Sequence, residues 1–365
     1  MSIKVALVHD WLTGYRGGEK VLEMLCEIFP KAPLYTLVYV KNSTTPLIEN
    51  RDVRTSFIQN LPYAKTRYRH YLPLFPIAAE TLNVKGYDFI FSTSHAVAKS
   101  IPTYGAKHWC YVHTPMRYVW DRFDDYFGPS RVGKAASNLF FKPVAVCLKK
   151  YDKMTQGRVD HYVANSHFVA ERIKKFYGRT AEIIHPPVEV AQFHGERNPQ
   201  DFYLFFSALV PYKKASHAIE ACVKLRRKLV IVGDGPEYES LKKQADSKLV
   251  SFVRRPDDIV VRKYLSEAKA LLFPGIEDFG IVPVEALASG LPVIGFRGGG
   301  LLDSQTEQTC VFYEEQTPFA LSNAILKFEN RAIPFNVDIL RKQADLFSRE
   351  KCKELIVNSV ENFIS

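Results

Sequence analysis

Two glutamates stand eight positions apart in the stretch FPGIEDFGIVPVEALASG, residues 273–290. On one continuous helix, this interval would leave Glu277 and Glu285 about 80° apart rather than aligned. The run ALLFP instead predicts a strand that ends at Pro274, and the next apolar run predicts a helix that begins near Val282. The residues between form a loop at the carboxyl end of a strand, where free amides and a helix dipole attract anions. A carboxylate on each side of an anion site could hold two ends of one extended ligand.

Three further stretches place cations, a histidine or glycines beside expected strand and helix ends. SALVPYKKASHAIEA has Lys213 and Lys214 before a helix, and YVHTPMRYVWD has His113 directly after a strand. TGYRGGEKVL has Gly17 and Gly18 before the first helix, where backbone amides could approach a phosphate closely. Each feature also has a structural interpretation: lysines that solvate a helix start, a histidine at a strand end, and an ordinary glycine turn.

The order of apolar runs predicts two doubly wound α/β domains in series. Short β-branched and aromatic runs alternate with amphipathic segments almost from end to end, which is typical of parallel sheets with crossover helices. We expect a first domain at residues 1–192 and a second at 193–340, starting at the polar stretch FHGERNPQD. Residues 341–365 are expected to be helical throughout and could pack back on the first domain. Open parallel sheets bind ligands at the carboxyl ends of their strands.

The composition limits which classes of partner and which kinds of site are expected. The chain has 365 residues, more than the ~250–300 at which a single hydrophobic core usually stops growing. Its formal net charge of +10 favours an anionic partner, such as a phosphorylated substrate, an anionic membrane face or nucleic acid. The six cysteines are scattered without C-x-x-C spacing, which argues against a zinc or redox site. The N-terminus lacks the layout of a secretory signal, so we expect a cytoplasmic protein.

The glutamate stretch as a whole, E-x-F-G-I-x-x-x-E-A-x-A-x-G-x-P-V-I, resembles the signature of the retaining glycosyltransferases of family 4. That resemblance implies an α/β architecture called GT-B, with two Rossmann-like domains that face a central cleft. It also implies that Glu277 meets the donor-sugar hydroxyls and Glu285 the ribose of a nucleotide sugar. The amides near Phe279, Gly280 and Ile281 would then lie by the sugar and the diphosphate.

Other stretches are similar to segments of the same family. The resemblance implies that Lys213 contacts the donor diphosphate and that His113 approaches the reaction centre. It further implies a donor-binding role for the remaining candidates, Gly17, Gly18, Lys214, Gly233, Gly235 and Arg254.

One position departs from the family pattern. The family has an arginine where this chain has Ala208, and alanine cannot make a bidentate phosphate contact. Either Lys214, Arg254 or Arg255 replaces this arginine, or the diphosphate is bound more weakly than in the family.

The resemblance implies transfer of a hexose from a nucleotide diphosphate with retention of configuration and without a required metal ion. Within the family, the segments GGEKVLE, HTPMRYVWD and ALVPYKK are most similar to those of bacterial mannosyltransferases that build O-antigen, a part of lipopolysaccharide, or exopolysaccharide. GDP-mannose is therefore the expected donor, with a UDP-sugar as the alternative, and the acceptor would be a glycan or a lipid-linked saccharide. A non-catalytic GT-B scaffold subunit and a sugar-nucleotide epimerase stay open as competing hypotheses, whereas no nucleic-acid-binding motif is present.

Two segments mix basic and aromatic or apolar residues, namely 54–76 and 131–153. Such mixtures suit the surface of an anionic membrane, which would place the protein on the inner face of the cytoplasmic membrane. A charged helix face packed on the core is the alternative interpretation of both.

Overall fold

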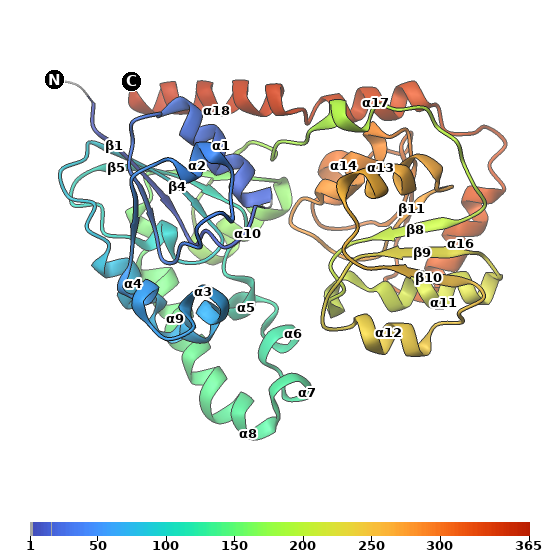
Figure 1. Cartoon of the computed structure of the whole chain (residues 1–365), viewed down its shortest axis with the longest axis horizontal. Helices are drawn as coiled ribbons and strands as arrows, with labels where there is room; N and C mark the ends of the chain where they lie inside the picture. The colour runs from blue at the N-terminus through green and yellow to red at the C-terminus, as the bar shows by residue number, and fades with distance from the viewer. Residues whose placement is uncertain (1–2, 16) are drawn as a thin grey trace. The chain divides into compact units, whose positions relative to one another are not determined.

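The computed structural model describes residues 3–15 and 17–365, which form two compact units. The first unit runs to Pro187 and takes in Cys352–Ser365, and the second is Val188–Lys351 (Figure 1). The units therefore divide at 187/188 and 351/352, whereas the boundaries expected from sequence are 192/193 and 340/341. The later second boundary arises because helix α17 (Val337–Asp345) contributes Leu340 and Ala344 to the core of the second unit.

A parallel sheet forms the centre of the first unit. Its strand order is β3-β2-β1-β4-β5-β6-β7, and every pairing in it is parallel. The strands are β1 (Val5–His9), β2 (Leu34–Thr36), β3 (Val53–Thr55), β4 (Phe89–Ser94), β5 (Lys107–Val112), β6 (His161–Ala164) and β7 (Glu182–Ile183).

Helices connect these strands and cover the sheet. The α-helices are α1 (Gly17–Ile28), α2 (Pro46–Glu49), α3 (Ala64–Arg67), α4 (Phe75–Thr81), α5 (Arg117–Trp120), α6 (Phe123–Phe127), α7 (Pro129–Val132), α8 (Lys134–Ala136), α9 (Lys142–Met154) and α10 (His167–Tyr177). Short 3₁₀ turns lie at η1 (Phe57–Asn60), η2 (Tyr68–Leu74), η3 (Ala98–Ser100) and η5 (Gln156–Arg158), and η4 (Ser137–Phe141) is a π-helical turn.

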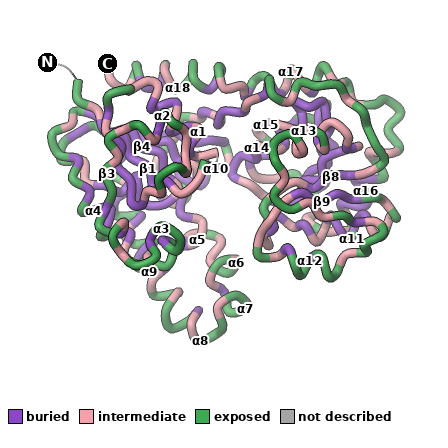
Figure 2. The backbone as a smooth tube through the Cα atoms, in the orientation of Figure 1, coloured by how far each residue is buried: buried purple, intermediate pink, exposed green. Residues whose placement is uncertain are grey.

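The two faces of this sheet bury separate cores, as strand alternation requires. Ala6 and Val8 of β1 pack into one core, whereas Leu7 packs into the other. The last helix, α18 (Arg349–Ile364), completes the Leu7 core with residues spaced four apart, Cys352, Ile356 and Val360. The buried Trp109 indole also donates a hydrogen bond to Ser359 Oγ at 3.0 Å. Figure 2 shows the buried strands enclosed by more exposed helices.

The second unit repeats the architecture with six parallel strands in the order β10-β9-β8-β11-β12-β13. The strands are β8 (Tyr203–Phe206), β9 (Leu229–Val232), β10 (Val250–Val253), β11 (Leu271–Phe273), β12 (Val293–Phe296) and β13 (Cys310–Tyr313). The helices are α11 (Ala215–Leu225), α12 (Tyr238–Gln244), α13 (Asp258–Glu267), α14 (Ile281–Ala288), α15 (Leu301–Ser304) and α16 (Pro318–Glu329), with α17 as above and 3₁₀ turns η6 (Val190–Phe193) and η7 (Pro211–Lys213). The expectation of two doubly wound α/β sheets is confirmed.

Local sequence signals explain where several helices begin and end. Ser166 caps α10 by accepting a hydrogen bond from the Val169 amide, and Gly178 ends it with φ of 70°. The expectation of a continuous helix at the end of the chain is wrong, because the backbone leaves the helix at 346–348. There Phe347 O accepts a hydrogen bond from the Val188 amide at 3.0 Å. This carbonyl is therefore paired outside the helix, between the end of α17 and the start of α18. Within the described residues, no helix combines the length and the apolar composition needed to cross a bilayer.

Candidate functional site

The order of strands reverses in the second sheet between β8 and β11, which lie side by side at Leu204 and Leu271. From β8 the chain runs outward through β9 and β10, and from β11 it runs the other way through β12 and β13. Open parallel sheets bind ligands at such a point, because the two loops that leave it diverge. The loop after β8 carries Lys213, and the loop after β11 carries Glu277.

The structure brings these two predicted site residues into direct contact. Lys213 Nζ and Glu277 Oε1 form an ion pair, and their side chains are 11% and 21% exposed. Both line a narrow, partly open recess at the carboxyl ends of the strands. The other lining residues are Phe205, Phe206, Ser207, Phe273, Pro274 and Gly275. A cation and a carboxylate with little access to water therefore share one edge of this recess.

Glycines hold the Glu277 loop against its neighbours. A side chain on Gly275 would meet the Lys213 Cα at 2.9 Å, so the two loops touch through their backbones. On the other side, the Gly300 amide donates to Glu277 O at 2.9 Å, and a Cβ on Gly300 would lie 2.2 Å from Asp278 O. The glycine turn after β12 thus fixes the backbone that carries Glu277.

Helix α14 begins at Ile281, and the residue before it, Gly280, has φ of +88°. That backbone favours glycine, so it explains the glycine that separates the loop from the helix. The Phe279 ring is buried and packs with Phe347 at 5.5 Å between centroids, so Phe279 anchors the loop in the core. Glu285 is half-buried and lies one turn into α14. The loop expected between the two glutamates is therefore present.

Gly233 and Gly235 follow β9 and allow two loops to interlock. A Cβ on Gly233 would lie 2.0 Å from Ser207 O, and one on Gly235 would lie 2.4 Å from Leu209 O. The Leu209 amide also donates to Asp234 O at 2.9 Å. These glycines thus have a packing reason that sequence did not reveal: they let the β9 loop support the loop that leads to Lys213.

The cations considered as replacements at Ala208 lie in different surroundings. Ala208 is exposed, and Lys214 is a half-buried residue with φ of 57° at the start of α11. Arg254 and Arg255 both bind the Asp234 carboxylate, with Nε–Oδ distances of 2.9 and 2.5 Å. Burial alone would raise the pKa of Asp234, but hydrogen bonds from the two arginines lower it. A phosphate ligand would have to compete with this carboxylate for both arginines.

The first sheet has its own switch point, between β1 and β4, and His113 follows the next strand, β5. His113 is half-buried, and its Nε2 has no hydrogen-bond partner among the described residues. A Cβ on Gly18 would lie 3.4 Å from this nitrogen, so the predicted glycine loop and the predicted histidine are neighbours. Gly17 is the first residue of α1. Burial, followed by the neighbouring His95 and His9, lowers the pKa of His113 to about 3, so its imidazole is neutral near pH 7.

Sequence reasoning missed four polar residues around His113, namely Asp10, His95, His9 and Glu19. Asp10 is buried and accepts hydrogen bonds from the four consecutive amides of residues 95–98, at 2.6 to 2.9 Å. Burial opposes the charge on Asp10, but His95 and these amides hold its pKa below the usual range. His9 donates to or accepts from Thr93 Oγ1 at 2.6 Å, and its other ring nitrogen lies 3.7 Å from Glu19. The motifs HDW and TSHA, each at the carboxyl end of a strand, were the available signal.

The pKa of His113 leads to a prediction about stability. An unfolded histidine titrates near pH 6.5, so between about pH 6.5 and pH 3 unfolding takes up a proton that the folded protein does not hold. Stability present above pH 6.5 is therefore lost as the pH falls through this window. We expect His113→Gln to make the pH dependence of urea unfolding shallower, by at most about 1.4 kcal/mol per pH unit. The same substitution at exposed His70 is the control, and equal slopes for the wild type and His113→Gln would contradict the prediction.

Within residues 3–15 and 17–365, no group of three or more histidine, cysteine, aspartate or glutamate side chains is placed to hold a metal ion.

Comparison with known proteins now connects both units to one family. The family model for glycosyltransferase family 4 matches residues 15–192, and the model for glycosyl transferases group 1 matches residues 189–344. Together they span the two units and both switch points. This chain belongs to the family 4 glycosyltransferases and has the GT-B fold.

Solved structures and curated relatives agree with this assignment. HepE from Anabaena in complex with UDP superposes on the glycosyltransferase with a TM-score of 0.69, at 15% identity over 99% of this chain and 100% of that one. Sucrose-phosphate synthase from Thermosynechococcus elongatus gives a TM-score of 0.72, at 15% identity over 100% and 99% of the two chains. At this identity the superpositions show the fold alone.

Among curated relatives, human alpha-1,3/1,6-mannosyltransferase ALG2 is 28% identical over 214 residues, which are 48% of this chain and 51% of the relative. The O-antigen chain mannosyltransferase RfbU of Salmonella typhimurium is 26% identical over 218 residues, 52% of this chain and 60% of the relative. The glycosyltransferase thus spans about half of the length of the curated relatives it matches.

Proposed function

We propose that this glycosyltransferase moves mannose from GDP-mannose, with retention of configuration, to a glycan or lipid-linked saccharide in surface-polysaccharide synthesis. The Lys213–Glu277 ion pair at the switch point of the second sheet carries the proposal. It combines an ammonium group suited to a diphosphate with a carboxylate suited to sugar hydroxyls. The names of two relatives, both mannosyltransferases, favour mannose. A UDP-sugar is the second candidate, because the structurally similar HepE was solved with UDP.

In the proposed site, Lys213 faces the diphosphate and offsets the negative charge that grows when the glycosidic bond breaks. Glu277 accepts hydrogen bonds from the donor sugar, and Glu285 accepts them from the ribose. The remaining proposed donor contacts come from the backbone or side chains of Gly17, Gly18, Lys214, Gly233, Gly235, Arg254, Phe279, Gly280 and Ile281. The glycine contacts that fix the Glu277 loop preorganise this arrangement, so little reorganisation is needed during transfer.

His113 acts in the proposal as a neutral hydrogen-bonding group at the reaction centre. Its low pKa keeps the imidazole uncharged at neutral pH, and its shielded Nε2 is available for a ligand. Its contribution is therefore orientation and a hydrogen bond rather than a positive charge. No metal ion is part of the proposed mechanism.

Nucleotide binding gives the most direct test. A ligand at 100 times its Kd stabilises the native state by about 2.7 kcal/mol, which should raise Tm by several degrees. We expect GDP and GDP-mannose to raise Tm in a thermal-shift assay, and UDP and guanosine to raise it less. A response to UDP alone would replace GDP-mannose by a UDP-sugar. No response to any nucleotide would contradict the proposed donor site.

A non-catalytic scaffold is the alternative to an enzymatic function, and the environment of Ala208 favours it. The arginines that could replace the family arginine are already bound to Asp234. Incubation with GDP-mannose and UDP-sugars distinguishes the two functions, because an enzyme of this kind releases free nucleotide and a scaffold releases none. Nucleotide release that depends on Glu277 would exclude the scaffold.

The proposal places the enzyme at the cytoplasmic face of the inner membrane, as a peripheral protein. A lipid-linked acceptor would be met there, and the net charge of +10 suits an anionic surface.

A further inference from the structure

We propose that residues 126–154 form the surface with which the enzyme docks on an anionic lipid bilayer, with Leu139 and Phe140 entering the headgroup region. This inference rests on the proposed function, since it names the surface beside which a lipid-linked acceptor would be met. The segment comprises the last two residues of α6, then α7, α8, η4 and α9. Figure 1 shows α6, α7 and α8 as short helices that project from the body of the first unit.

Large apolar side chains on this segment are exposed to solvent. The exposed fractions are 81% for Leu139, 53% for Phe140, 65% for Val146 and 71% for Met154. In Figure 2 the segment is drawn mostly as exposed or intermediate. Leu139, Phe140 and Val146 lie within two turns of one another along the chain, and exposed apolar residues that are neighbours can mark an interaction site.

Along this stretch of the sequence the charge has one sign. Between Tyr126 and Tyr151 the sequence contains no Asp or Glu but five cations, Arg131, Lys134, Lys142, Lys149 and Lys150. Each basic residue near an anionic membrane contributes roughly 1 kcal/mol of attraction. A lipid bilayer with anionic headgroups complements both the apolar and the basic part of this surface.

Helix α9 and the turn before it arrange these residues in stripes. Leu139 and Val146 are seven residues apart, which aligns them on one side of a helix, and the exposed Met154 lies about 80° further round. Lys142, Lys149 and Lys153 follow an adjacent exposed stripe, and Ala145, Leu148 and Asp152 form the buried side. Apolar, basic and buried stripes in this order are typical of a helix that lies in a membrane interface while its third side packs on protein.

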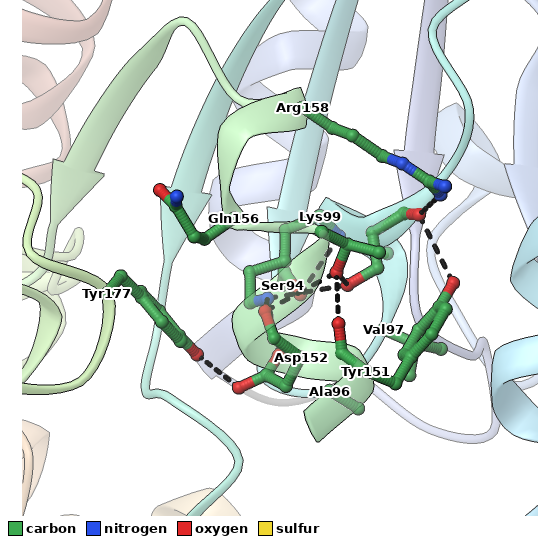
Figure 3. A network of polar contacts seen from close by, with 12 residues as sticks. Ser94, Ala96, Val97, Lys99, Tyr151, Asp152, Gln156, Arg158 and Tyr177 are labelled. Carbon is green, nitrogen blue, oxygen red and sulfur yellow. Dashed lines mark hydrogen bonds and ion pairs between the residues drawn. The ribbon is translucent and has the colours of Figure 1, made fainter. Parts of the chain in front are cut away.

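A buried polar network holds the base of α9 in the first unit (Figure 3). Asp152 forms an ion pair with Lys99, and both side chains are almost fully buried. The second oxygen of Asp152 accepts hydrogen bonds from Trp120 Nε1 at 2.7 Å and from Tyr177 OH at 2.8 Å. Breaking such a network would leave a buried charge unpaired. The exposed stripe is therefore presented on a firmly anchored helix.

Aromatic stacking supports the far end of the segment. Phe141 stacks on Phe127 at 4.6 Å between centroids with planes 8° apart, and Phe140 lies edge-on to Phe141 at 5.1 Å. This stack holds η4 against α6, so Leu139 and Phe140 are presented from a supported turn.

The other basic and aromatic segment, 54–76, is less suited to this role. Arg67 and Arg69 lie over the rings of Tyr63 and Tyr68, 5.5 and 5.4 Å from the centroids. Phe75 and Tyr68 are buried in the core of the first unit. Tyr68 and Phe75 thus serve packing, and although Tyr63 is 74% exposed, the larger number of exposed aliphatic and basic residues favours residues 126–154 as the surface.

Vesicle co-sedimentation of the full chain tests the inference without any sugar donor. We expect wild-type protein to bind phosphatidylglycerol vesicles more tightly than phosphatidylcholine vesicles, and added salt to weaken the binding. The double variant Leu139→Asp, Phe140→Asp should bind phosphatidylglycerol at least tenfold more weakly, since a buried Leu or Phe contributes about that factor. The matched control is Ile259→Asp, Ile333→Asp, which changes two exposed apolar residues of the second unit.

Several outcomes would overturn the inference. These are absence of binding to phosphatidylglycerol vesicles, an equal loss in the control pair, or undiminished binding of the Leu139, Phe140 variant. Dimers that depend on Leu139 and Phe140, without vesicle binding, would show instead that this face joins two copies. Turnover with a water-soluble acceptor is measured separately and should be the same in wild type and variant. Loss of turnover in all proteins would reject the proposed function and leave the vesicle result intact.

Discussion

Replacing Glu277 with Gln lowers kcat for hexose transfer by roughly two to three orders of magnitude and changes Tm little. The amide keeps the shape of the side chain, and its oxygen can still accept a hydrogen bond from Lys213. It loses the negative charge that pairs with Lys213 and that would bind the donor-sugar hydroxyls strongly. Loss of one preorganised electrostatic contact in a site with little solvent typically costs a factor of this size. Steady-state kinetics with GDP-mannose measures the effect.

The exposed Glu315 provides the matched control for this substitution, because it lies in the same unit and outside the recess. Glu315→Gln is expected to transfer hexose at the wild-type rate. Equal turnover by Glu277→Gln and the wild type would show that the assignment of the site is wrong.

Replacing Lys213 with Met lowers kcat by a similar factor, about 10²–10³. Methionine approximates the length of the lysine stem, so the packing of Gly275 against the Lys213 backbone is kept. The diphosphate would lose its cation, and Glu277 would lose its partner. Because the two residues form one ion pair, their effects should not be independent.

A double-mutant cycle measures this coupling. The variant with both substitutions should lose clearly less activity than the product of the two single losses, because either change already disrupts the pair. Lys224→Met, on α11 of the same unit, is the control for the loss of a lysine charge. Strict multiplicativity of the two losses would mean that the ion pair has no part in the transfer step.

The repeating pattern of apolar runs was enough to predict both sheets, because strand alternation and helix periodicity are local properties. The ends of α10 were predictable for the same reason, since Ser166 and Gly178 act on the adjacent backbone. The break at 346–348 was not, because it depends on a hydrogen bond between Phe347 and Val188, which are distant in sequence. The division at 187/188 likewise follows from long-range packing.

The candidate site was likewise predictable only in part. Lys213 and Glu277 could be picked out singly, but their ion pair depends on β8 lying beside β11, which no local pattern specifies. The need for glycine at Gly233 and Gly235 was also not visible in the sequence, because a Cβ there would collide with backbone oxygens of residues 207 and 209. Asp10 and His95 were overlooked for a different reason. They follow β1 and β4, and their importance becomes visible only when these strands are known to be neighbours.

The position of α18 has a consequence for synthesis on the ribosome. The core that contains Leu7 and Trp109 is completed by Cys352, Ile356 and Val360, which are translated after the whole of the second unit. Domains usually fold as they emerge, at about 5–20 residues per second. Here the unit that is started first is finished last, because the second unit is inserted into it. During this interval the apolar face that awaits α18 is open to solvent, so the first unit reaches its final stability only after the last residues have left the ribosome.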